Sequence, residues 1–412
     1  MSVIVQKFGG TSVGDLDRIR NVAERVVETR RAGHDVVVVV SAMAGETDRL
    51  VELAHAISPD PDPREYDVLV ATGEQKTIAL LAMAIQALGV SARSFTGGQV
   101  RVQTDGDHSR ARIHKIDTGP IRETLAQGAV VVVAGFQGTD PEGDITTLGR
   151  GGSDTSAVAV AAALKADVCE IYTDVDGVYT SDPNVVPNAR KIDRISYDEM
   201  LEMASLGAKV LQIRSVKFGK RYGIPIHVRS SFSKKEGTWV VAESEIMERL
   251  VVSGVTYNRG EAKVTIFGVP DVPGVAAEIF GPMSEAGILV DVIVQNVSAN
   301  EKTDMTFTVA RRDLRKALPI AEAVGKQLGA AGVKSDDTIA KVSVVGLGMK
   351  DHAGVASKMF RVLRDEGINI QMINTSEIKI SIVIAEKYTE LACRSLHDAF
   401  ELGNLPLEEE QV

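Results

Sequence analysis

The stretch Thr146-Thr147-Leu148-Gly149-Arg150-Gly151-Gly152-Ser153-Asp154 is the one around which the rest of the chain is organised. Its three glycines let the backbone turn sharply and approach a ligand without interference from a Cβ atom. Ser153 and Asp154 are favourable N-caps, and apolar residues follow at helical spacing from Ala157 to Leu164. The loop is therefore expected to end at a helix N-terminus, where free N–H groups and the helix dipole favour an anion. Arg150 adds a forked cation that suits a carboxylate or a phosphate group.

Length and composition are those of a globular protein of two or three domains: 412 residues, 44% hydrophobic and 25% charged. The formal net charge of −10 argues against general nucleic-acid binding. We find no apolar run long enough to predict a membrane span, and the N-terminus lacks the pattern of a signal peptide. The two cysteines, Cys169 and Cys393, lie among apolar residues, which favours buried thiols in a reducing compartment. We expect a cytoplasmic protein that binds neither nucleic acid nor membrane.

The N-terminal part has the pattern of an α/β domain with a mostly parallel sheet. Val3-Ile4-Val5 predicts a strand, and an amphipathic helix follows it and stops at Gly33. Val36–Val40 and Val130–Ala134 are continuous apolar runs, as expected of parallel strands covered on both faces. In such sheets the ligand loops gather at the carboxyl ends of the strands. Segments of this kind follow the predicted strands at residues 7–12, 41–47, 135–138 and 173–179.

The C-terminal part contains an internal repeat. Pro273–Phe280 matches Ala353–Phe360 at an offset of 80 residues, and the match continues through Gly287 with Gly367. Two copies of such a long unit predict a pair of small α+β domains rather than a solenoid. The expected domains are residues 1–240, 241–335 and 336–412.

Three motifs resemble the signatures of aspartate kinases, which belong to the amino-acid kinase family: Lys7-Phe8-Gly9-Gly10-Thr11-Ser12, Gly149–Asp154 and Thr173–Gly177. The C-terminal repeat resembles a tandem pair of ACT domains. This resemblance covers essentially the whole chain and implies a three-layer αβα kinase domain followed by two ferredoxin-like α+β ACT domains. It implies an enzyme that uses ATP and Mg²⁺ to phosphorylate the β-carboxylate of L-aspartate. That reaction is the committed step towards lysine, threonine, methionine and diaminopimelate.

The resemblance also implies roles for individual residues. Lys7 is expected to bridge the β- and γ-phosphates as a point cation, and Asp154 to orient Lys7 and the metal. Glu74, in the first turn of a predicted helix, is the expected partner of the α-ammonium group. Arg150 is the expected partner of the α-carboxylate, because a guanidinium can pair with it through two hydrogen bonds. The expected catalytic residues are therefore Lys7, Glu74 and Asp154.

The expected binding residues form two overlapping sets. The aspartate set contains Ser41, Thr47, Glu74, Arg150, Gly151, Gly152 and Ser153. The nucleotide set contains Lys7, Phe8, Gly9, Gly10, Ser41, Ser153, Thr173, Asp174, Tyr179, Asp182, Lys209 and Val210.

The implied reaction requires little covalent help from the protein. A substrate carboxylate is already ionised at pH 7, so a strong general base is not needed. The sequence agrees, because its seven histidines form no zinc spacing and no histidine–carboxylate constellation near the motifs. Mg²⁺ keeps water and phosphate ligands, so we expect few protein ligands and no dedicated metal site.

The ACT pair is expected to bind effectors where the strand-to-helix loop of one unit meets a strand of its partner. Candidates in the first unit are Asp271, Gly274, Val275, Ala276, Asp291, Gln295, Asn296 and Ser298. Candidates in the second are Ala353, Gly354, Val355, Asn369, Ile370, Asn374, Thr375, Ser376 and Glu377. The side-chain amide of Asn369 can form hydrogen bonds with an amino acid. The matching residue of the first unit is Leu289, at a position where the family often has Asn, so the effector contacts there are expected to differ.

The resemblance implies feedback inhibition by lysine, threonine or both, and a homo-oligomer formed through the ACT domains. A pair that only dimerises is the alternative. In some relatives an internal start near the position of Met247 yields a shorter regulatory chain, which is a further possibility for this protein.

The glycine loop taken alone also fits a structural turn before a capped helix. For the protein as a whole, two other functions stay open at this point. The first is a kinase of another acidic metabolite, such as glutamate or an N-acylated amino acid, on the same fold. An N-acylated substrate has no ammonium group for Glu74, and those relatives generally lack an ACT pair. The second is a non-catalytic amino-acid sensor, which would not need Lys7, Arg150 and Asp154 together.

Overall fold

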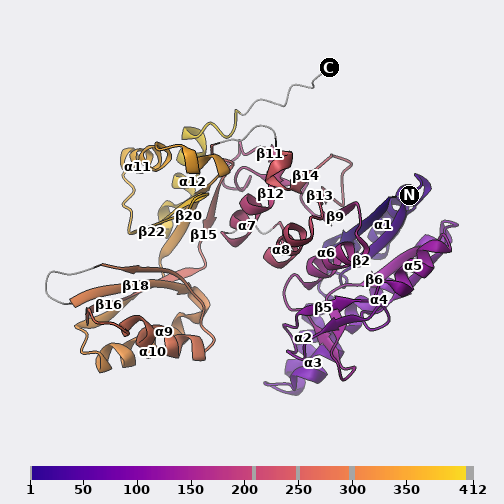
Figure 1. Ribbon diagram of the computed structural model, residues 1–412, viewed down its shortest axis with the longest axis horizontal. Coiled ribbons are helices and arrows are strands. Elements are labelled where there is room, and N and C mark those ends of the chain that lie inside the picture. The colour runs from indigo at the N-terminus through magenta and orange to yellow at the C-terminus, as the bar shows by residue number, and fades with distance from the viewer. Residues whose placement is uncertain (1, 207–209, 247–250, 297–301, 405–412) are drawn as a thin grey trace. The chain divides into compact units, whose positions relative to one another are not determined.

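The computed structural model describes residues 2–206, 210–246, 251–296 and 302–404. The chain forms two compact units (Figure 1). The first contains Met1–Val178, Lys191–Ser205 and Lys209–Glu248, and the second contains Tyr179–Arg190, Leu206–Ala208 and Arg249–Val412. The segment Tyr179–Arg190 thus leaves the first unit, joins the second and returns.

The first unit is built on an eight-stranded sheet with the order β12-β14-β13-β9-β1-β2-β6-β3. Its strands are β1 (Val3–Phe8), β2 (Asp35–Val40), β3 (Ala92–Phe95), β6 (Val130–Ala134), β9 (Val168–Thr173), β12 (Arg194–Ser196), β13 (Ile226–Ser230) and β14 (Thr238–Val241). Neighbouring strands run parallel, except for the antiparallel pair β13 and β14. The predicted central, mostly parallel sheet is confirmed.

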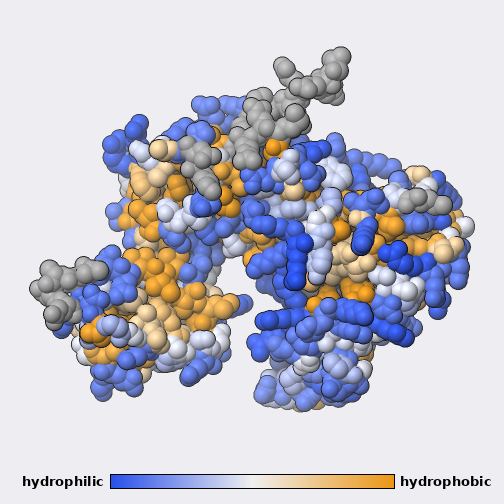
Figure 2. All heavy atoms as spheres, in the orientation of Figure 1, coloured by the Kyte–Doolittle hydropathy of each residue, from blue (hydrophilic) through white to orange (hydrophobic). Residues whose placement is uncertain are grey.

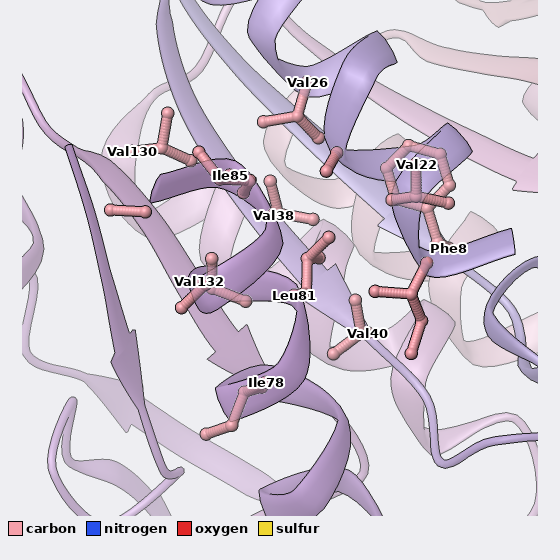
Figure 3. Close-up of a cluster of buried hydrophobic side chains, with 14 of the residues drawn as sticks. Phe8, Val22, Val26, Val38, Val40, Ile78, Leu81, Ile85, Val130 and Val132 are labelled. Carbon is pink, nitrogen blue, oxygen red and sulfur yellow. The ribbon is translucent and has the colours of Figure 1, made fainter. Parts of the chain in front are cut away.

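Helices cover both faces of this sheet and make it a three-layer αβα unit. Helices α1 (Leu16–Arg31) and α4 (Thr72–Ala87) bury their apolar faces on one side, and Figure 3 shows their side chains against those of Phe8, Val38 and Val132. Helix α6 (Gly152–Leu164) packs against β1, β2 and β9. Because successive strand residues point to opposite faces, Phe8 points towards α1 while Lys7 points towards α6. This alternation brings the Lys7 side chain to the helix that follows the glycine loop.

Smaller elements complete the first unit. The remaining helices of the unit are α2 (Glu46–Ile57), α3 (Pro63–Val70), α5 (Gly119–Ala126), α7 (Tyr197–Ser205) and α8 (Ile213–Tyr222). A small sheet with the order β5-β4-β7-β8 consists of β4 (Val102–Thr104), β5 (Ile113–Ile116), β7 (Gln137–Thr139) and β8 (Ile145–Thr147). Helix α3 packs on β8, which leads directly into the glycine loop. The short strands β10 (Val178–Tyr179) and β11 (Lys191–Ile192) pair with each other.

The stretch Pro63–Ala87 is long and apolar enough, by length and composition alone, to cross a membrane. This finding corrects the expectation that the chain has no such run. Half of the most apolar window is buried, and the stretch consists of the two helices α3 and α4, which meet at Ala71. A buried core helix of a soluble protein passes the same test, so the stretch is weak evidence for a membrane segment.

The second unit contains two antiparallel four-stranded sheets. The first has the order β17-β18-β16-β19 and consists of β16 (Glu261–Pro270), β17 (Val290–Gln295), β18 (Lys302–Ala310) and β19 (Gly332–Asp336). Figure 1 shows its helices α9 (Val275–Glu285) and α10 (Leu314–Gln327) on one side of it. The second sheet has the order β15-β20-β22-β21 and consists of β15 (Gly254–Asn258), β20 (Ile339–Val345), β21 (Met372–Thr375) and β22 (Lys379–Ala385). Its helices are α11 (Val355–Asp365) and α12 (Thr389–Ala399).

The first repeat is nested inside the second. Strand β15 precedes the first repeat in the chain, yet it pairs with β20 and completes the sheet of the second repeat. The expected division of the C-terminal part into 241–335 and 336–412 therefore separates β15 from the sheet to which it belongs. Both repeats are α+β units, as expected, and each contains a four-stranded antiparallel sheet.

The segment Tyr179–Arg190 is packed into the second unit. Val185 and Val186 belong to the buried cluster formed with β15, β20, β22, α11 and α12. The Thr180 hydroxyl lies 2.9 Å from Nε2 of His397, a fully buried residue of α12. The chain that follows the third motif is thus part of the core of the second repeat.

Candidate active site

Lys7 and Asp154 form a nearly buried ion pair at the carboxyl end of β1. Nζ of Lys7 lies 2.6 Å from Oδ1 of Asp154, and the two side chains are 11% and 12% exposed. A Cβ atom on Gly9 would lie 3.2 Å from the Lys7 ammonium, and one on Gly10 would lie 3.0 Å from the carbonyl oxygen of Ala42. Gly9 therefore keeps space beside a fixed cation, as phosphate oxygens require, and Gly10 allows the close approach of the segment that contains Ala42.

The glycine loop ends at α6, as predicted, but its capping differs from the prediction. The N-cap is Gly151 in the left-handed conformation, with a φ of +71°. Ser153 and Asp154 lie inside the first turn of α6 and are not the caps that the sequence suggested. This placement frees the Asp154 carboxylate to reach Lys7, and it puts an acidic group at the positive end of the helix dipole.

Two other residues of the loop face different surroundings. Arg150 is exposed to solvent, directly after Gly149, whose φ is +72°. Ser153 is 8% exposed, and its Oγ would lie 2.9 Å from a Cβ atom on Gly135. The loop thus presents Arg150 outwards and keeps the Ser153 hydroxyl close to the end of β6.

Glu74 is a buried carboxyl in the first turn of α4. It is 3% exposed, and its Oε1 accepts a 3.0 Å hydrogen bond from the backbone N–H of Ala42. Its Oε2 has no hydrogen-bond partner among the described residues. Burial raises the pKa of Glu74 to about 7, while the N–H of Ala42 acts in the opposite direction. A buried carboxyl with one unpaired oxygen suits a cationic ligand such as an ammonium group.

Ser41 directly follows β2 and Thr47 lies in the first turn of α2, and both are half-buried. The N–H of Ser41 donates a 3.1 Å hydrogen bond to the carbonyl oxygen of Phe8. Thr47 follows Gly45, the N-cap of α2 with a φ of +76°, by two residues. Both therefore lie close in sequence to Ala42, whose N–H donates to Glu74.

The residues that the sequence predicts for the nucleotide belong to both units. Thr173 is the last residue of β9 and Asp174 follows it in the first unit, and the Thr173 hydroxyl donates a 3.1 Å hydrogen bond to Asp174. Tyr179 and Asp182 belong to the second unit, where Asp182 accepts a 2.9 Å hydrogen bond from the hydroxyl of Tyr257.

The remaining nucleotide residues differ in what they can offer. The Phe8 side chain is fully buried and stacks on Tyr172 with ring centroids 4.6 Å apart, so only its backbone is available to a ligand. Val210 is half-buried in a turn, and Lys209 lies outside the described residues.

Sequence reasoning missed two polar residues that hold the glycine loop. Asp67 on α3 is fully buried and accepts hydrogen bonds from the backbone N–H and the hydroxyl of Thr147, at 2.9 and 2.7 Å. Arg214 on α8 donates to the carbonyl oxygens of Leu148 and Ala111, at 2.6 and 3.0 Å. Both are distant from the loop in sequence and belong to no motif, so no local signal could have pointed to them.

The candidate effector residues are mainly at the surface of the second unit. Gly274 is the N-cap of α9 with a φ of +101°, and Val275 and Val355 are buried anchors of α9 and α11. Most others are exposed: Asp271, Ala276, Asp291, Gln295, Asn296, Ala353, Gly354, Asn369, Thr375, Ser376 and Glu377. Ile370 and Asn374 are half-buried, and Ser298 lies outside the described residues.

Among the described residues, no group of three or more His, Cys, Asp or Glu side chains could hold a metal ion. The acidic group that contacts the Lys7 ammonium is Asp154. A divalent ion at this place would therefore need phosphate and water as its main ligands.

The chain matches known families and proteins along its whole length. A model of the amino acid kinase family matches residues 2–230, and a model of the ACT domain matches residues 264–323 and 342–400. The aspartate kinase of Pseudomonas putida is 60% identical over 403 residues, which are 98% of this chain and 98% of the relative.

Two solved structures of E. coli aspartokinase III are also similar to the chain. Its R-state complex with aspartate and ADP has 27% identity and a TM-score of 0.80, and covers 96% of this chain and 99% of that chain. Its T-state complex with lysine and aspartate has 27% identity and a TM-score of 0.75, and covers 97% and 99%.

The family model matches more than half of the chain, and the P. putida relative is similar from end to end. These findings confirm the resemblance seen in the three motifs and in the C-terminal repeat. The chain therefore belongs to the aspartate kinases, the members of the amino acid kinase family that transfer a phosphoryl group from ATP to aspartate.

Proposed function

We propose that the ion pair of Lys7 and Asp154, together with Glu74 and Arg150, carries the phosphoryl transfer of this aspartate kinase. The reaction moves the γ-phosphoryl group of ATP to the β-carboxylate of L-aspartate and gives 4-phospho-L-aspartate. It is the first step in the biosynthesis of lysine, threonine, methionine and diaminopimelate. The observation that carries the assignment is the buried cation of Lys7, fixed at 2.6 Å from Asp154 beside two glycines.

Lys7 would neutralise charge on the transferring phosphoryl group. A transition state of this kind needs positioning and electrostatic stabilisation more than covalent chemistry. Asp154 holds the ammonium in place, and Gly9, which has no Cβ next to it, would leave room for phosphate oxygens. Gly10 would offer its backbone to the phosphates. The Ser153 hydroxyl would donate a further hydrogen bond to phosphate. Mg²⁺, when bound, would add charge neutralisation, with Asp154 as the available carboxylate and phosphate and water as the other ligands.

Glu74 and Arg150 would hold the two charged groups of the aspartate α-carbon. The unpaired Oε2 of Glu74 suits the α-ammonium group, and the exposed guanidinium of Arg150 suits the α-carboxylate. Ser41 and Thr47 would add neutral hydrogen bonds from the segment after β2. The β-carboxylate, ionised at neutral pH, would then face the phosphoryl group without a general base.

The nucleotide would lie along the loops after β1 and β9. We assign its contacts to the backbone of Phe8, to Gly9, Gly10 and Ser41, and to the sequence-predicted residues Thr173, Asp174, Tyr179, Asp182, Lys209 and Val210. Support comes from the order of the motifs in the chain and from the ADP in the related E. coli enzyme.

Lys7→Met and Asp154→Asn test the assignment in a coupled steady-state assay with ATP and aspartate. We expect kcat to fall by roughly 10²–10³-fold in each, because a preorganised charge is lost from the transition state. Lys220→Met is the matched control, since Lys220 also pairs with an aspartate, Asp198, at 2.5 Å but on the exposed surface of α8. The control should keep its activity and its unfolding midpoint. A Lys7→Met enzyme that is folded and as active as the control would overturn the assignment.

Lysine, threonine or both would act as feedback effectors at the loops Asp271–Ala276 and Ala353–Val355. The support is the match of both repeats to ACT domains and the lysine complex of the related E. coli enzyme. Calorimetric titration of each amino acid, alone and with the other, tests this proposal, and an absence of binding by both would contradict it.

We also propose a homo-oligomer formed through the ACT repeats. Figure 2 shows hydrophobic surface on the part of the second unit that holds β16 and β18. The edge strands β17 and β21, with the residue before β17, carry exposed apolar side chains: Leu289 is 84%, Ile293 50% and Ile373 45% exposed. Such apolar edges are a ready surface for pairing with a second chain. The mass in solution tests the proposal, and a monomer at micromolar concentration would contradict it.

Two further proposals concern expression and location. A shorter regulatory chain could begin near Met247, a position outside the described residues; a single band on expression from the intact gene would count against it. We place the protein in the cytoplasm, where the buried free thiols of Cys169 and Cys393 would stay reduced.

A further inference from the structure

We propose that Asp67 and Arg214 are positioning residues that fix the glycine loop, and that Asp67 sets the spacing between the two groups that hold aspartate. The inference rests on the proposed roles of Arg150 and Glu74 in binding the substrate. Neither Asp67 nor Arg214 belongs to a motif of the family resemblance.

Asp67 is a fully buried carboxylate surrounded by donors from two chain segments. Besides the N–H and hydroxyl of Thr147, it accepts from the N–H of Ser109 at 2.9 Å and the hydroxyl of Ser109 at 3.3 Å. Nδ1 of His108 lies 3.1 Å from its Oδ2. A buried carboxylate with this many donors is held in one position, so the segments that supply the donors are held as well.

Arg214 binds the same two segments from a different helix. Its guanidinium donates to Leu148, at the start of the glycine loop, and to Ala111, two residues after Ser109. The N–H of Ala111 in turn donates to the carbonyl oxygen of Thr147 at 2.9 Å. The residues that lead to Arg150, Thr147 and Leu148, are therefore held by the carboxylate of Asp67 on α3 and the guanidinium of Arg214 on α8.

We call Asp67, Arg214 and the two segments that they hold the loop frame. The backbone around this frame is strained. Ser109 has a φ of +67°, a conformation that a residue other than glycine adopts at a penalty of roughly 1–2 kcal/mol. A Cβ atom on Gly149 would lie only 2.8 Å from the carbonyl oxygen of Ser109. Phe136, whose carbonyl oxygen accepts from the N–H of Leu148, has a φ of +69°. Strain that persists in this way is often found where geometry serves a function.

Asp67 also connects the loop to Glu74. Asp67 is on α3 and Glu74 is in the first turn of α4, and the two helices meet at Ala71. The side-chain amide of Gln137 donates to the carbonyl oxygen of Ala71 at 2.9 Å and fixes this junction. The helix pair that presents Glu74 to the α-ammonium group thus also holds the loop that presents Arg150 to the α-carboxylate. Errors in this spacing should weaken aspartate binding and leave ATP binding unchanged.

Thr147→Val tests the inference with little change in volume. It removes one donor to Asp67, and we expect the KM for aspartate to rise by roughly fivefold or more while the KM for ATP changes by less than about twofold. Thr146→Val is the matched control, because Thr146 is equally buried but bonds to the Thr104 hydroxyl at 2.6 Å instead. The control should lower the unfolding midpoint to a similar extent and leave both KM values unchanged.

Asp67→Asn and Arg214→Lys test the frame from its two sides. Both should raise the KM for aspartate selectively, since an amide brings N–H groups against the donors and a lysine cannot reach both carbonyl oxygens with one ammonium. In an Arg150→Ala background, Thr147→Val should add no further increase, because its effect acts through Arg150.

Three results would overturn the inference. Equal KM values in the Thr147→Val and Thr146→Val enzymes would show that the frame is only structural. An equal rise of the KM values for ATP and aspartate would remove the link to the substrate. If Arg150→Ala itself leaves the KM for aspartate unchanged, the proposed role of Arg150 fails first, and the positioning role falls with it.

Discussion

Two loops of this protein have a similar backbone, but one is tightly packed and the other is open to solvent. The glycine loop before α6 and the loop before α9 both follow a strand, and both end at a glycine N-cap in the left-handed conformation: Gly151 at +71° and Gly274 at +101°. Around the glycine loop, a Cβ atom on Gly149 would lie 2.8 Å from a backbone oxygen. At Gly274, no heavy atom of the described residues lies within 4 Å of such a Cβ atom.

The difference shows how the two loops, proposed here to be catalytic and regulatory, obtain their shape. The glycine loop is held by side chains from α3 and α8, so its geometry exists before any substrate arrives. The loop before α9 carries exposed residues such as Asp271 and Ala276, and can adapt to a ligand or to another chain. Preorganisation favours catalysis, whereas an adaptable loop favours a response to an effector.

Gly149→Ala should produce the largest effect. The new Cβ would force the loop away from Ser109, and alanine would be strained in the left-handed backbone conformation of Gly149. A displacement of Arg150 by about 1 Å alone can lower activity by roughly a hundredfold. We expect kcat/KM for aspartate to fall by roughly a thousandfold in a coupled assay. Gly274→Ala introduces the same kind of strain without a clash, at a penalty of about 1 kcal/mol, and should keep the uninhibited activity. Similar activities of the two variants would break the comparison.

Lys341→Met should have the next largest effect, on stability. Lys341 is 4% exposed on β20, pairs with Glu261 of β16 at 2.5 Å and also contacts Asp291 of β17. Since Glu261 is 6% exposed, its charge would be left buried without its partner, which destabilises by about 3 kcal/mol or more.

Urea unfolding of the second unit measures the effect of Lys341→Met, and Lys326→Met on the exposed surface of α10 is the control. The result would sharpen the comparison by showing that the regulatory unit is rigid beneath its open loops. A loss as small as that of the control would show that the two repeats do not depend on this ion cluster.

Glu74→Gln should change the pH dependence of stability by a smaller amount. Burial raises the pKa of Glu74 from 4.5 to about 7, so the folded state favours the neutral carboxyl. That stability is fully present below about pH 4.5 and is lost as the pH rises through about 7. Glutamine escapes the loss, so relative to wild type the variant should gain on the order of 2 kcal/mol between pH 5 and pH 8.

Glu46→Gln provides the contrast. Hydrogen bonds from Arg49 and Lys76 lower the pKa of Glu46 to about 2, so this carboxyl is ionised across the whole range. Its variant should show a constant difference from wild type at every pH tested. A constant difference for Glu74→Gln as well would show that the carboxyl of Glu74 is not held in a desolvated site.

Thr180→Val should have the smallest effect, about 1 kcal/mol of unfolding free energy. The Thr180 hydroxyl accepts from the N–H of Arg190 at 3.0 Å and lies next to Nε2 of the buried His397. Its loss loosens the segment Tyr179–Arg190 within the second unit. Thr389→Val in the same unit serves as the control, because among the described residues its hydroxyl donates to the nearby carbonyl oxygen of Glu386, at the start of α12, and forms no hydrogen bond with the segment Tyr179–Arg190. An unchanged stability of Thr180→Val would contradict the packing of this segment.

Much of the first unit could be predicted because its signals are local. Continuous apolar runs such as Val36–Val40 predicted the parallel sheet, and the motifs predicted the residues at its edge. The capping of α6 could not be predicted, because Ser153 and Asp154 are good caps by themselves and the tertiary ion pair of Asp154 with Lys7 decides their placement. The role of Asp67 could not be predicted either, because it depends on tertiary contacts with residues 108, 109 and 147.

The second unit was predicted in type but not in connectivity. The offset of 80 residues identified two α+β repeats, and both sheets are present. The pairing of β15 with β20 spans the whole first repeat, and neither strand carries a signal that specifies such a distant partner. The entry of Tyr179–Arg190 into this unit likewise follows from hydrophobic contacts that only the folded chain creates.

A crystal structure of the full chain with ADP, Mg²⁺ and aspartate tests the central claim most directly. Our account predicts phosphate oxygens beside the Lys7 ammonium, the aspartate ammonium group at Glu74, and its α-carboxylate at Arg150. Aspartate bound elsewhere, with Lys7 still paired to Asp154 and no phosphate near it, would contradict the account.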